Sequence, residues 1–121
     1  MKKKVLIVED EEGLCQFMKE LFERKGLEAL VFTDSGKAWE AFKKERPQAC
    51  ILDIHMPFSE FDGLELLRRI RKIDQDTRCA MITRIGDKEK IEEAQKLGVY
   101  KYIFKPASLE DMKKLVEEIS S

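Results

Sequence analysis

Val5-Leu6-Ile7-Val8-Glu9-Asp10 sets the pattern of this chain, because an uninterrupted apolar run ends directly in two acids. Three more short apolar runs end in the same way, at a polar residue: Cys50-Ile51-Leu52 before Asp53, Ala80-Met81-Ile82 before Thr83, and Tyr102-Ile103-Phe104 before Lys105. In an open parallel sheet the carboxyl ends of the strands line one edge, and ligands bind at that edge. The sequence therefore predicts that two carboxylates, a hydroxyl and an ammonium group meet at one rim.

Between the apolar runs, apolar residues recur at the spacing of amphipathic helices. We expect strands at residues 5–8, 29–32, 49–52, 79–82 and 102–104, each followed by one helix. Runs that are apolar at every position are typical of parallel strands covered on both faces. With right-handed crossovers, this alternation predicts an α/β fold of the (βα)5 type, a doubly wound five-stranded parallel sheet in a three-layer sandwich.

Residues that commonly cap or terminate helices indicate where the expected helices begin and end. Asp34 or Ser35 is placed to cap the second helix and Asp87 the fourth, while Ser108 begins a sequence that resembles a capping box. Gly26 and Gly98 are placed to end the first and fourth helices, and Pro47 stops the second.

Length and charge narrow the class of protein. The chain has 121 residues and a formal net charge of −1, from 23 basic and 24 acidic residues. We expect a single domain over residues 1–121 and no direct binding of nucleic acid, because no excess positive charge is available to neutralise phosphates. The basic start is followed by an apolar run too short for a signal peptide or a membrane span. Three cysteines without a CxxC pair indicate reduced thiols in a cytoplasmic protein.

The predicted rim has the chemistry of phosphoryl transfer. Glu9 and Asp10 end the first strand and Asp53 ends the third, so their carboxylates can share a cation, for which Mg²⁺ is suited. A carboxylate can also act as a nucleophile towards phosphorus and form an acyl phosphate. Lys105 supplies positive charge for the transferred group and Thr83 a hydrogen bond.

Over essentially its whole length the chain resembles a response-regulator receiver domain of the CheY-like superfamily. The motifs that carry the resemblance are residues 5–10, Leu52-Asp53-Ile54-His55-Met56-Pro57, Gly63-Leu64-Glu65, Ile82-Thr83 and Lys105-Pro106. The resemblance implies the flavodoxin-like strand order 2-1-3-4-5. It also implies that Asp53 is the phosphoacceptor, and that Glu9, Asp10, Asp53 and the backbone carbonyl of His55 hold Mg²⁺.

The same resemblance implies a signalling switch that catalyses only its own phosphorylation and dephosphorylation. Thr83 matches the switch hydroxyl, Tyr102 the switch aromatic and Lys105 the phosphate-binding lysine. The expected phosphodonor is a sensor histidine kinase or a phosphotransfer protein. The expected output is a downstream effector or a fused output domain, reached through the face of helix 4, strand 5 and helix 5. The protein is expected to be a monomer or a phosphorylation-dependent homodimer.

The chain departs from the family pattern in three places. Arg84 follows the switch threonine, where a small residue is usual, and can pair with the phosphoryl group and slow its hydrolysis. The loop from Pro57 to Gly63 is two residues longer than usual, and Glu60 or Asp62 in it is a candidate partner for Arg84; a harmless surface insertion is the alternative. His55 is the only histidine, and its side chain is free either to face solvent or to influence water near the site.

Other functions remain open on the sequence. One is an interaction module of the same fold that does not use phosphate, although every residue that the phosphoryl chemistry requires is present. Another is a small-molecule binder of the flavodoxin type, which would need a phosphate-binding loop after the first strand. That loop is acidic here and would repel an anion. A hydrolase is disfavoured because no histidine-based dyad is available beyond His55.

Overall fold

Five strands and five helices alternate along residues 2–84 and 88–121, which are the residues that the computed structural model describes. The strands form one parallel sheet in the order β2-β1-β3-β4-β5. The predicted (βα)5 fold and strand order are therefore confirmed. The strand bounds are β1 Lys4–Val8, β2 Glu28–Phe32, β3 Ala49–Leu52, β4 Arg78–Thr83 and β5 Lys101–Phe104.

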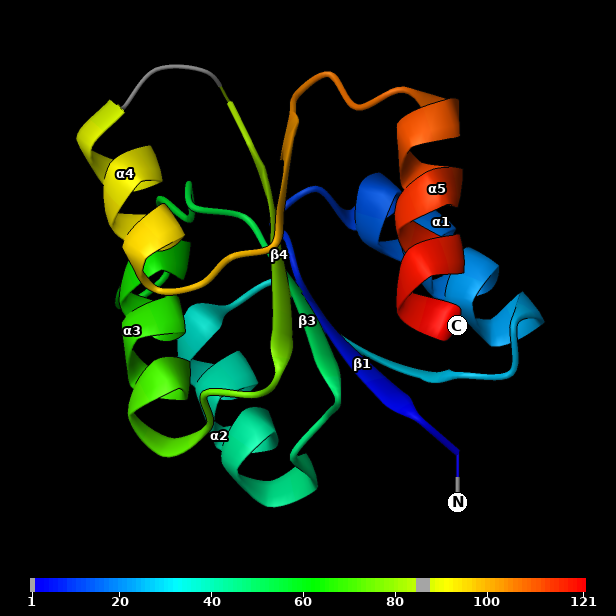
Figure 1. Cartoon of the computed structure of the whole chain (residues 1–121), viewed down its shortest axis with the longest axis horizontal. Helices are drawn as coiled ribbons and strands as arrows, with labels where there is room; N and C mark the ends of the chain where they lie inside the picture. The colour runs from blue at the N-terminus through cyan, green and yellow to red at the C-terminus, as the bar shows by residue number, and fades with distance from the viewer. Residues whose placement is uncertain (1, 85–87) are drawn as a thin grey trace.

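The helices cover the sheet in two layers. Helices α1 and α5 lie on one face, and α2, α3 and α4 lie on the other, with the sheet seen nearly edge-on between them (Figure 1). This is the predicted three-layer sandwich. The helix bounds are α1 Glu12–Arg24, α2 Ser35–Glu45, α3 Gly63–Ile73, α4 Lys88–Lys96 and α5 Leu109–Ser120.

The central strands are apolar at every position because both of their faces are buried. Val5 and Ile7 of β1 pack into the core beneath α1 and α5, whereas Leu6 and Val8 pack into the core beneath α2, α3 and α4. All four side chains are fully buried. Alternate residues of the strand point to opposite faces, and each face is covered by a core. Every position is therefore apolar, which is typical of a strand buried on both faces.

Most of the expected helix ends are confirmed. Asp34, not Ser35, caps α2 by accepting a hydrogen bond from the Lys37 amide at 2.9 Å. Ser108 accepts from the Asp111 amide at 3.0 Å at the start of α5. Gly26 and Gly98 follow α1 and α4 with φ of +85° and +79°, a conformation that glycine adopts without strain.

The remaining expectations concern Asp87, the cysteines and the membrane. The predicted cap at Asp87 lies outside the described residues. The three cysteines are all free and buried. None of the helices within residues 2–84 and 88–121 combines the length and the apolarity that crossing a membrane requires.

Candidate functional site

The predicted rim forms at the carboxyl edge of the sheet. Glu9 and Asp10 follow β1, Asp53 follows β3, Thr83 ends β4 and Lys105 follows β5. Parallel pairing keeps these strand ends level, because the last residues of β1 and β3 lie opposite each other, as do those of β4 and β5. Two backbone hydrogen bonds continue the pairing into the site: Asp53 N to Val8 O at 2.9 Å and Lys105 N to Thr83 O at 2.7 Å.

Lys105 joins the acids of two different strands. Its ammonium nitrogen lies 2.8 Å from Glu9 Oε1 and 3.0 Å from Asp53 Oδ2. The Glu9 and Asp53 residues are only 1% and 2% exposed. Carboxylates this deeply buried need a positive charge nearby. Lys105 therefore meets that need for both carboxylates.

Backbone amides orient the two buried carboxylates. The Glu11 amide donates to Glu9 Oε2 at 3.0 Å, and the His55 amide donates to Asp53 Oδ1 at 3.0 Å. Gly63 approaches the backbone of Asp53 so closely that a Cβ there would lie 1.9 Å from the Asp53 carbonyl oxygen. The position of the predicted phosphoacceptor is thus set by rigid main chain on both sides.

The acidic cluster has the donor set of a hard divalent cation. One carboxylate oxygen from each of Glu9, Asp10 and Asp53 lies within 4.8 Å of the others. Within the described part of the chain, the buried Glu9 Oε1 accepts no hydrogen bond of acceptable geometry, although Lys105 is close to it. Oxygen ligands on a partly open rim suit Mg²⁺, which keeps several of its waters. The residues present therefore fit such an ion.

Burial raises the proton affinity of both buried acids. Desolvation raises the pKa of Glu9 to about 8, even though the hydrogen bond from Lys105 acts in the opposite direction. Desolvation likewise raises the pKa of Asp53 above its ordinary value, again against the effect of Lys105. A divalent cation would favour the charged forms of both, so cation binding and proton loss are linked at this site.

The expected switch residues lie on the neighbouring strands β4 and β5. Thr83 is only 4% exposed at the end of β4. Tyr102, three residues before Lys105, is partly buried on β5, and its hydroxyl donates to the Ile91 carbonyl of α4 at 2.9 Å. Tyr102 also stacks on Phe104, with ring centroids 6.5 Å apart. Tyr102 thus links β5 directly to α4.

Arg84 does not pair with the loop acids that we considered for it. Its side chain is 67% exposed and its nearest ion-pair distance is 3.9 Å, to Glu11 Oε1. Asp62 instead caps α3 through the Glu65 amide and pairs with Lys90 at 2.9 Å. Asp62, one of the two candidate partners, is therefore paired with Lys90 and not with Arg84 in this structure.

The carboxylate of Glu60 lies close to the start of α2. Its Oε2 lies 3.6 Å from the position of a Cβ built on Gly36, in the first turn of α2. A carboxylate at that end of a helix is favoured by the helix dipole. Within the described residues, Arg84 has its ion-pair contact with Glu11 and not with Glu60.

Glu11 is a site residue that the sequence reasoning missed. Its Oε1 lies 3.7 Å from Lys105 Nζ as well as 3.9 Å from Arg84 Nη2, so it lies between the two cations. These three residues also line a cavity of about 380 Å³ next to the acidic cluster. The signal was present in the sequence, because Glu11 directly continues the acidic run after β1.

Comparison with known families identifies the family to which this chain belongs. The model of the response regulator receiver domain matches residues 5–117, and the chain belongs to that family. The protein is thus a receiver domain of the kind found in two-component response regulators.

Individual relatives agree with the family assignment. Sporulation initiation phosphotransferase F of Bacillus subtilis is 30% identical over 118 residues, covering 98% of this chain and 94% of that protein. Transcriptional regulatory protein RprY of Bacteroides fragilis is 31% identical over 118 residues. The match covers 98% of this chain but only 49% of RprY. The crystal structure of the receiver domain of NtrX from Brucella abortus superposes with a TM-score of 0.83 at 28% identity, covering 96% of this chain and 97% of that one.

Proposed function

We propose that this receiver domain is a phosphorylation-operated switch whose phosphoacceptor is Asp53. The observation that carries the proposal is the Lys105 ammonium between the buried carboxylates of Glu9 and Asp53, at 2.8 and 3.0 Å. A phosphoryl group on Asp53 would add negative charge where this cation already lies. Glu9, Asp10, Asp53 and the backbone carbonyl of His55 are the proposed holders of Mg²⁺.

The proposed reaction is a direct transfer to a carboxylate. A carboxylate oxygen of Asp53 attacks the phosphorus of a partner's phosphohistidine, the P–N bond breaks, and the imidazole keeps the electron pair. Mg²⁺, when bound, offsets the negative charge of the acids and of the phosphoryl oxygens. Lys105 stays paired with the new phosphoryl group, and the Thr83 hydroxyl donates a hydrogen bond to it.

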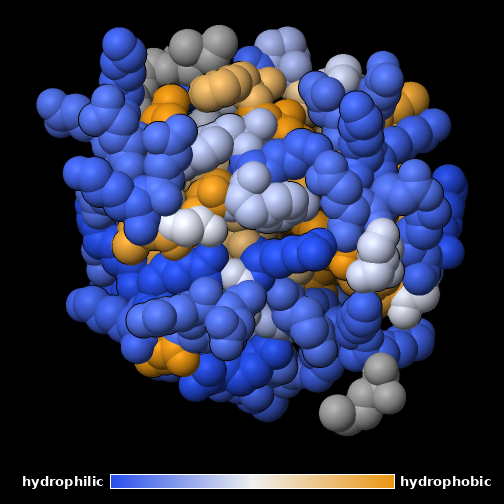
Figure 2. Space-filling model, in the orientation of Figure 1, coloured by the Kyte–Doolittle hydropathy of each residue, from blue (hydrophilic) through white to orange (hydrophobic). Residues whose placement is uncertain are grey.

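The proposed output follows from the contacts of Thr83 and Tyr102. Movement of Thr83 towards the phosphoryl group makes room for Tyr102, whose hydroxyl bond to Ile91 holds α4 in the present arrangement. The face made by α4, β5 and α5 would then repack. Figure 2 shows that apolar and weakly polar side chains gather along the middle of this side of the molecule, between hydrophilic side chains. Such a surface suits a partner that binds the domain in only one of its two states, phosphorylated or unphosphorylated.

The proposed partners are a sensor histidine kinase or phosphotransfer protein upstream and an effector or fused output domain downstream. The name of the Bacillus relative, a phosphotransferase, supports a role in a phosphorelay. We propose that the domain acts in the cytoplasm, as its three free thiols suggest, and that its own chemistry is limited to gaining and losing the phosphoryl group. A monomer and a phosphorylation-dependent dimer both fit this role.

The proposal is tested by phosphorylating the purified protein with acetyl phosphate and Mg²⁺ and measuring its intact mass. We expect one added phosphoryl group in the wild type, and none in Asp53→Asn or when Mg²⁺ is chelated. Asp76→Asn is the matched control, because Asp76 is an exposed aspartate before β4, at the opposite edge of the sheet. It should be phosphorylated like the wild type.

The other outcomes separate the alternatives. A wild-type protein that binds Mg²⁺ but gains no phosphoryl group would contradict the use of small phosphodonors and point to a site opened only by a protein donor. A folded protein with neither the adduct nor Mg²⁺ binding would overturn the proposal. It would instead support an interaction module that works without phosphate.

A further inference from the structure

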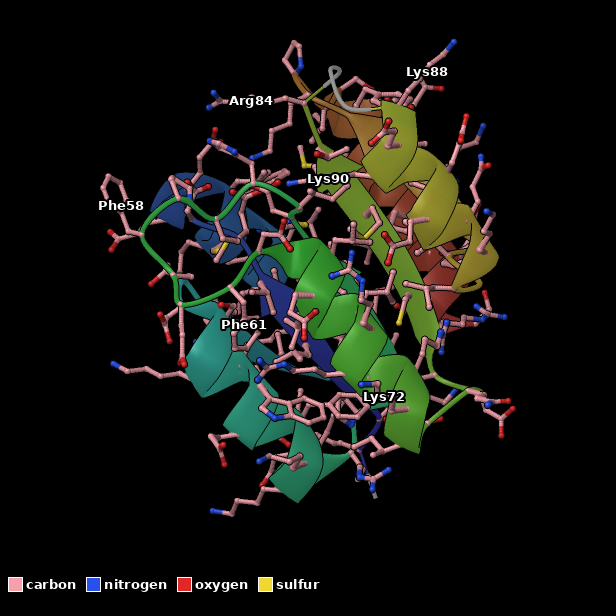
Figure 3. All side chains as sticks on the ribbon, turned by 90° about the vertical axis from the view of Figure 1, so that its left-hand side faces the viewer. Phe58, Phe61, Lys72, Arg84, Lys88 and Lys90 are labelled. Carbon is pink, nitrogen blue, oxygen red and sulfur yellow. The ribbon has the colours of Figure 1, made fainter. Side chains whose placement is uncertain are left out.

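The loop between β3 and α3 presents one aromatic side chain to solvent. Phe58 is 98% exposed, whereas the other exposed large apolar side chains in the described residues lie between 41% and 50%. Figure 3 shows Phe58 pointing away from the molecule at the outer bend of this loop. Nearly complete exposure of a phenyl ring is unfavourable in water, so a partner surface that covers it would gain from doing so.

Hydrogen bonds to α2 hold this loop in place. The Ser59 amide donates to the Met56 carbonyl at 3.1 Å and closes a turn around Phe58. The Ser35 amide donates to Ser59 Oγ at 3.1 Å, and the buried Ser35 hydroxyl donates to the Phe61 carbonyl at 2.5 Å. The segment that follows Phe58 is therefore attached at two points to Ser35, the first residue of α2.

The second aromatic of the loop anchors it to α3. The Arg69 guanidinium lies 3.9 Å from the centre of the Phe61 ring, and Phe61 packs against the core beneath α2, α3 and α4. The Gly63 amide bonds to the Ile54 carbonyl at 3.0 Å and brings the two ends of the loop together. Phe61 is thus the structural aromatic, and Phe58 is held outward by a loop that is otherwise well fixed.

We propose that Phe58 is an anchor for the protein that phosphorylates Asp53. Phe58 follows Asp53 by five residues, which span at most about 18 Å even when fully extended. The turn at Met56–Ser59 shortens that path. A protein interface of ordinary size covers about 800 Å² on each partner, a disc about 16 Å in radius. The footprint of a donor that brings its phosphohistidine to Asp53 is therefore large enough to extend to the loop that carries Phe58.

The partner that this surface fits is a phosphohistidine protein with an apolar depression beside its histidine. Aromatic side chains that insert into such depressions dominate the binding energy of many interfaces. A small phosphodonor makes no such contact, so the role of Phe58 is confined to protein donors. The inference rests on the proposed function, because it requires that Asp53 receives its phosphoryl group from a protein.

The test compares protein donors with acetyl phosphate. The histidine kinases and histidine phosphotransfer domains of the source genome are purified and phosphorylated, and the donor that transfers fastest to the wild type is chosen. With that donor, Phe58→Ala should lower kcat/KM about tenfold, mainly through KM, whereas Phe58→Leu should retain most of it. Acetyl phosphate should phosphorylate wild type and both variants at rates within about twofold of one another.

Ile73→Ala is the matched control. Ile73 is also an exposed apolar residue, at 41%, but it ends α3 at the opposite edge of the sheet. It should transfer like the wild type with every donor. Unchanged transfer to Phe58→Ala from the fastest donor would overturn the inference, as would a wild type that acetyl phosphate phosphorylates but no protein donor does. Failure of acetyl phosphate and of every protein donor to label Asp53 would instead overturn the proposed function itself.

Discussion

Glu9 is the acid of the site whose pKa is raised furthest, to about 8, while the pKa of Asp53 is raised in the same direction. Burial raises the pKa of Glu9 from 4.5 to about 8, so between these values the folded protein binds a proton that the unfolded chain releases. Stability must then fall as pH rises through that window. We expect the free energy of unfolding, measured with urea in EDTA, to decrease between about pH 5 and pH 8.

Two variants isolate this contribution. Glu9→Gln removes the titrating group, so its free energy of unfolding should change little over this pH range. Glu20→Gln changes an exposed glutamate of α1, and its free energy of unfolding should decrease with pH as in the wild type. A wild type whose stability rises across the same range would show that Glu9 stays charged in the metal-free protein.

Arg84 is the residue that we expect to set the lifetime of the phosphorylated form. Its side chain is 67% exposed and lies 3.9 Å from Glu11, which in turn lies 3.7 Å from Lys105, so Arg84 borders the cation that we propose to pair with the phosphoryl group. An exposed charge pair contributes up to about 1 kcal/mol, so Arg84→Ala should shorten the lifetime by about two- to fivefold. The decay of the phosphorylated mass with time measures this. The lifetime of phosphorylated Arg84→Lys should lie between those of the wild type and Arg84→Ala. An unchanged lifetime in Arg84→Ala would show that Arg84 does not control dephosphorylation.

At the scale of elements, the start of α3 must lie directly against the end of β3. A Cβ at Gly63 would come within 1.9 Å of the Asp53 carbonyl oxygen, which is backbone and has little freedom to move. We expect Gly63→Ala to lower the free energy of unfolding by about 3 kcal/mol, the upper part of the usual range for overpacking. It should also slow phosphorylation by acetyl phosphate, because Asp53 is displaced.

Gly13 provides the matched control for Gly63. It lies in α1, and nothing is within 4 Å of a Cβ built on it. Gly13→Ala should therefore leave stability unchanged or raise it by up to about 1 kcal/mol, since alanine favours a helix more than glycine does. Equal stability of the two alanine variants in urea unfolding would contradict the close approach at Gly63.

The sequence predicted the elements well and the loops between them poorly, for a physical reason. A strand covered on both faces consists of consecutive apolar residues, as in Val5 to Val8, so it can be recognised in the sequence. The polar residue at its end then gives the position of the rim. The partners of Arg84, Glu60 and Asp62 depend instead on segments distant along the chain. The hydroxyl of Ser35, for example, bonds to Phe61, 26 residues away, and no local pattern contains that contact.

At the scale of the whole molecule, the strand order creates the site. β1 lies between β2 and β3, so Glu9 and Asp10 meet Asp53 although more than 40 residues separate them. β5 adds Lys105 from the far edge of the sheet. Because only the folded chain holds these groups together, anything that binds the acidic cluster also stabilises the fold.

Mg²⁺ is therefore expected to stabilise the whole domain by mass action. At a concentration one hundredfold above its Kd, a ligand of the folded state alone adds about 2.7 kcal/mol to the free energy of unfolding. Urea unfolding at increasing Mg²⁺ should show this gain for the wild type and for the control Asp76→Asn, but little of it for Asp10→Asn. The gain should also shrink as the pH is lowered below about 8, because a proton on Glu9 competes with the ion. A gain that Asp10→Asn retains in full would place the cation elsewhere, and the proposed coupling between folding and the acidic cluster would be wrong.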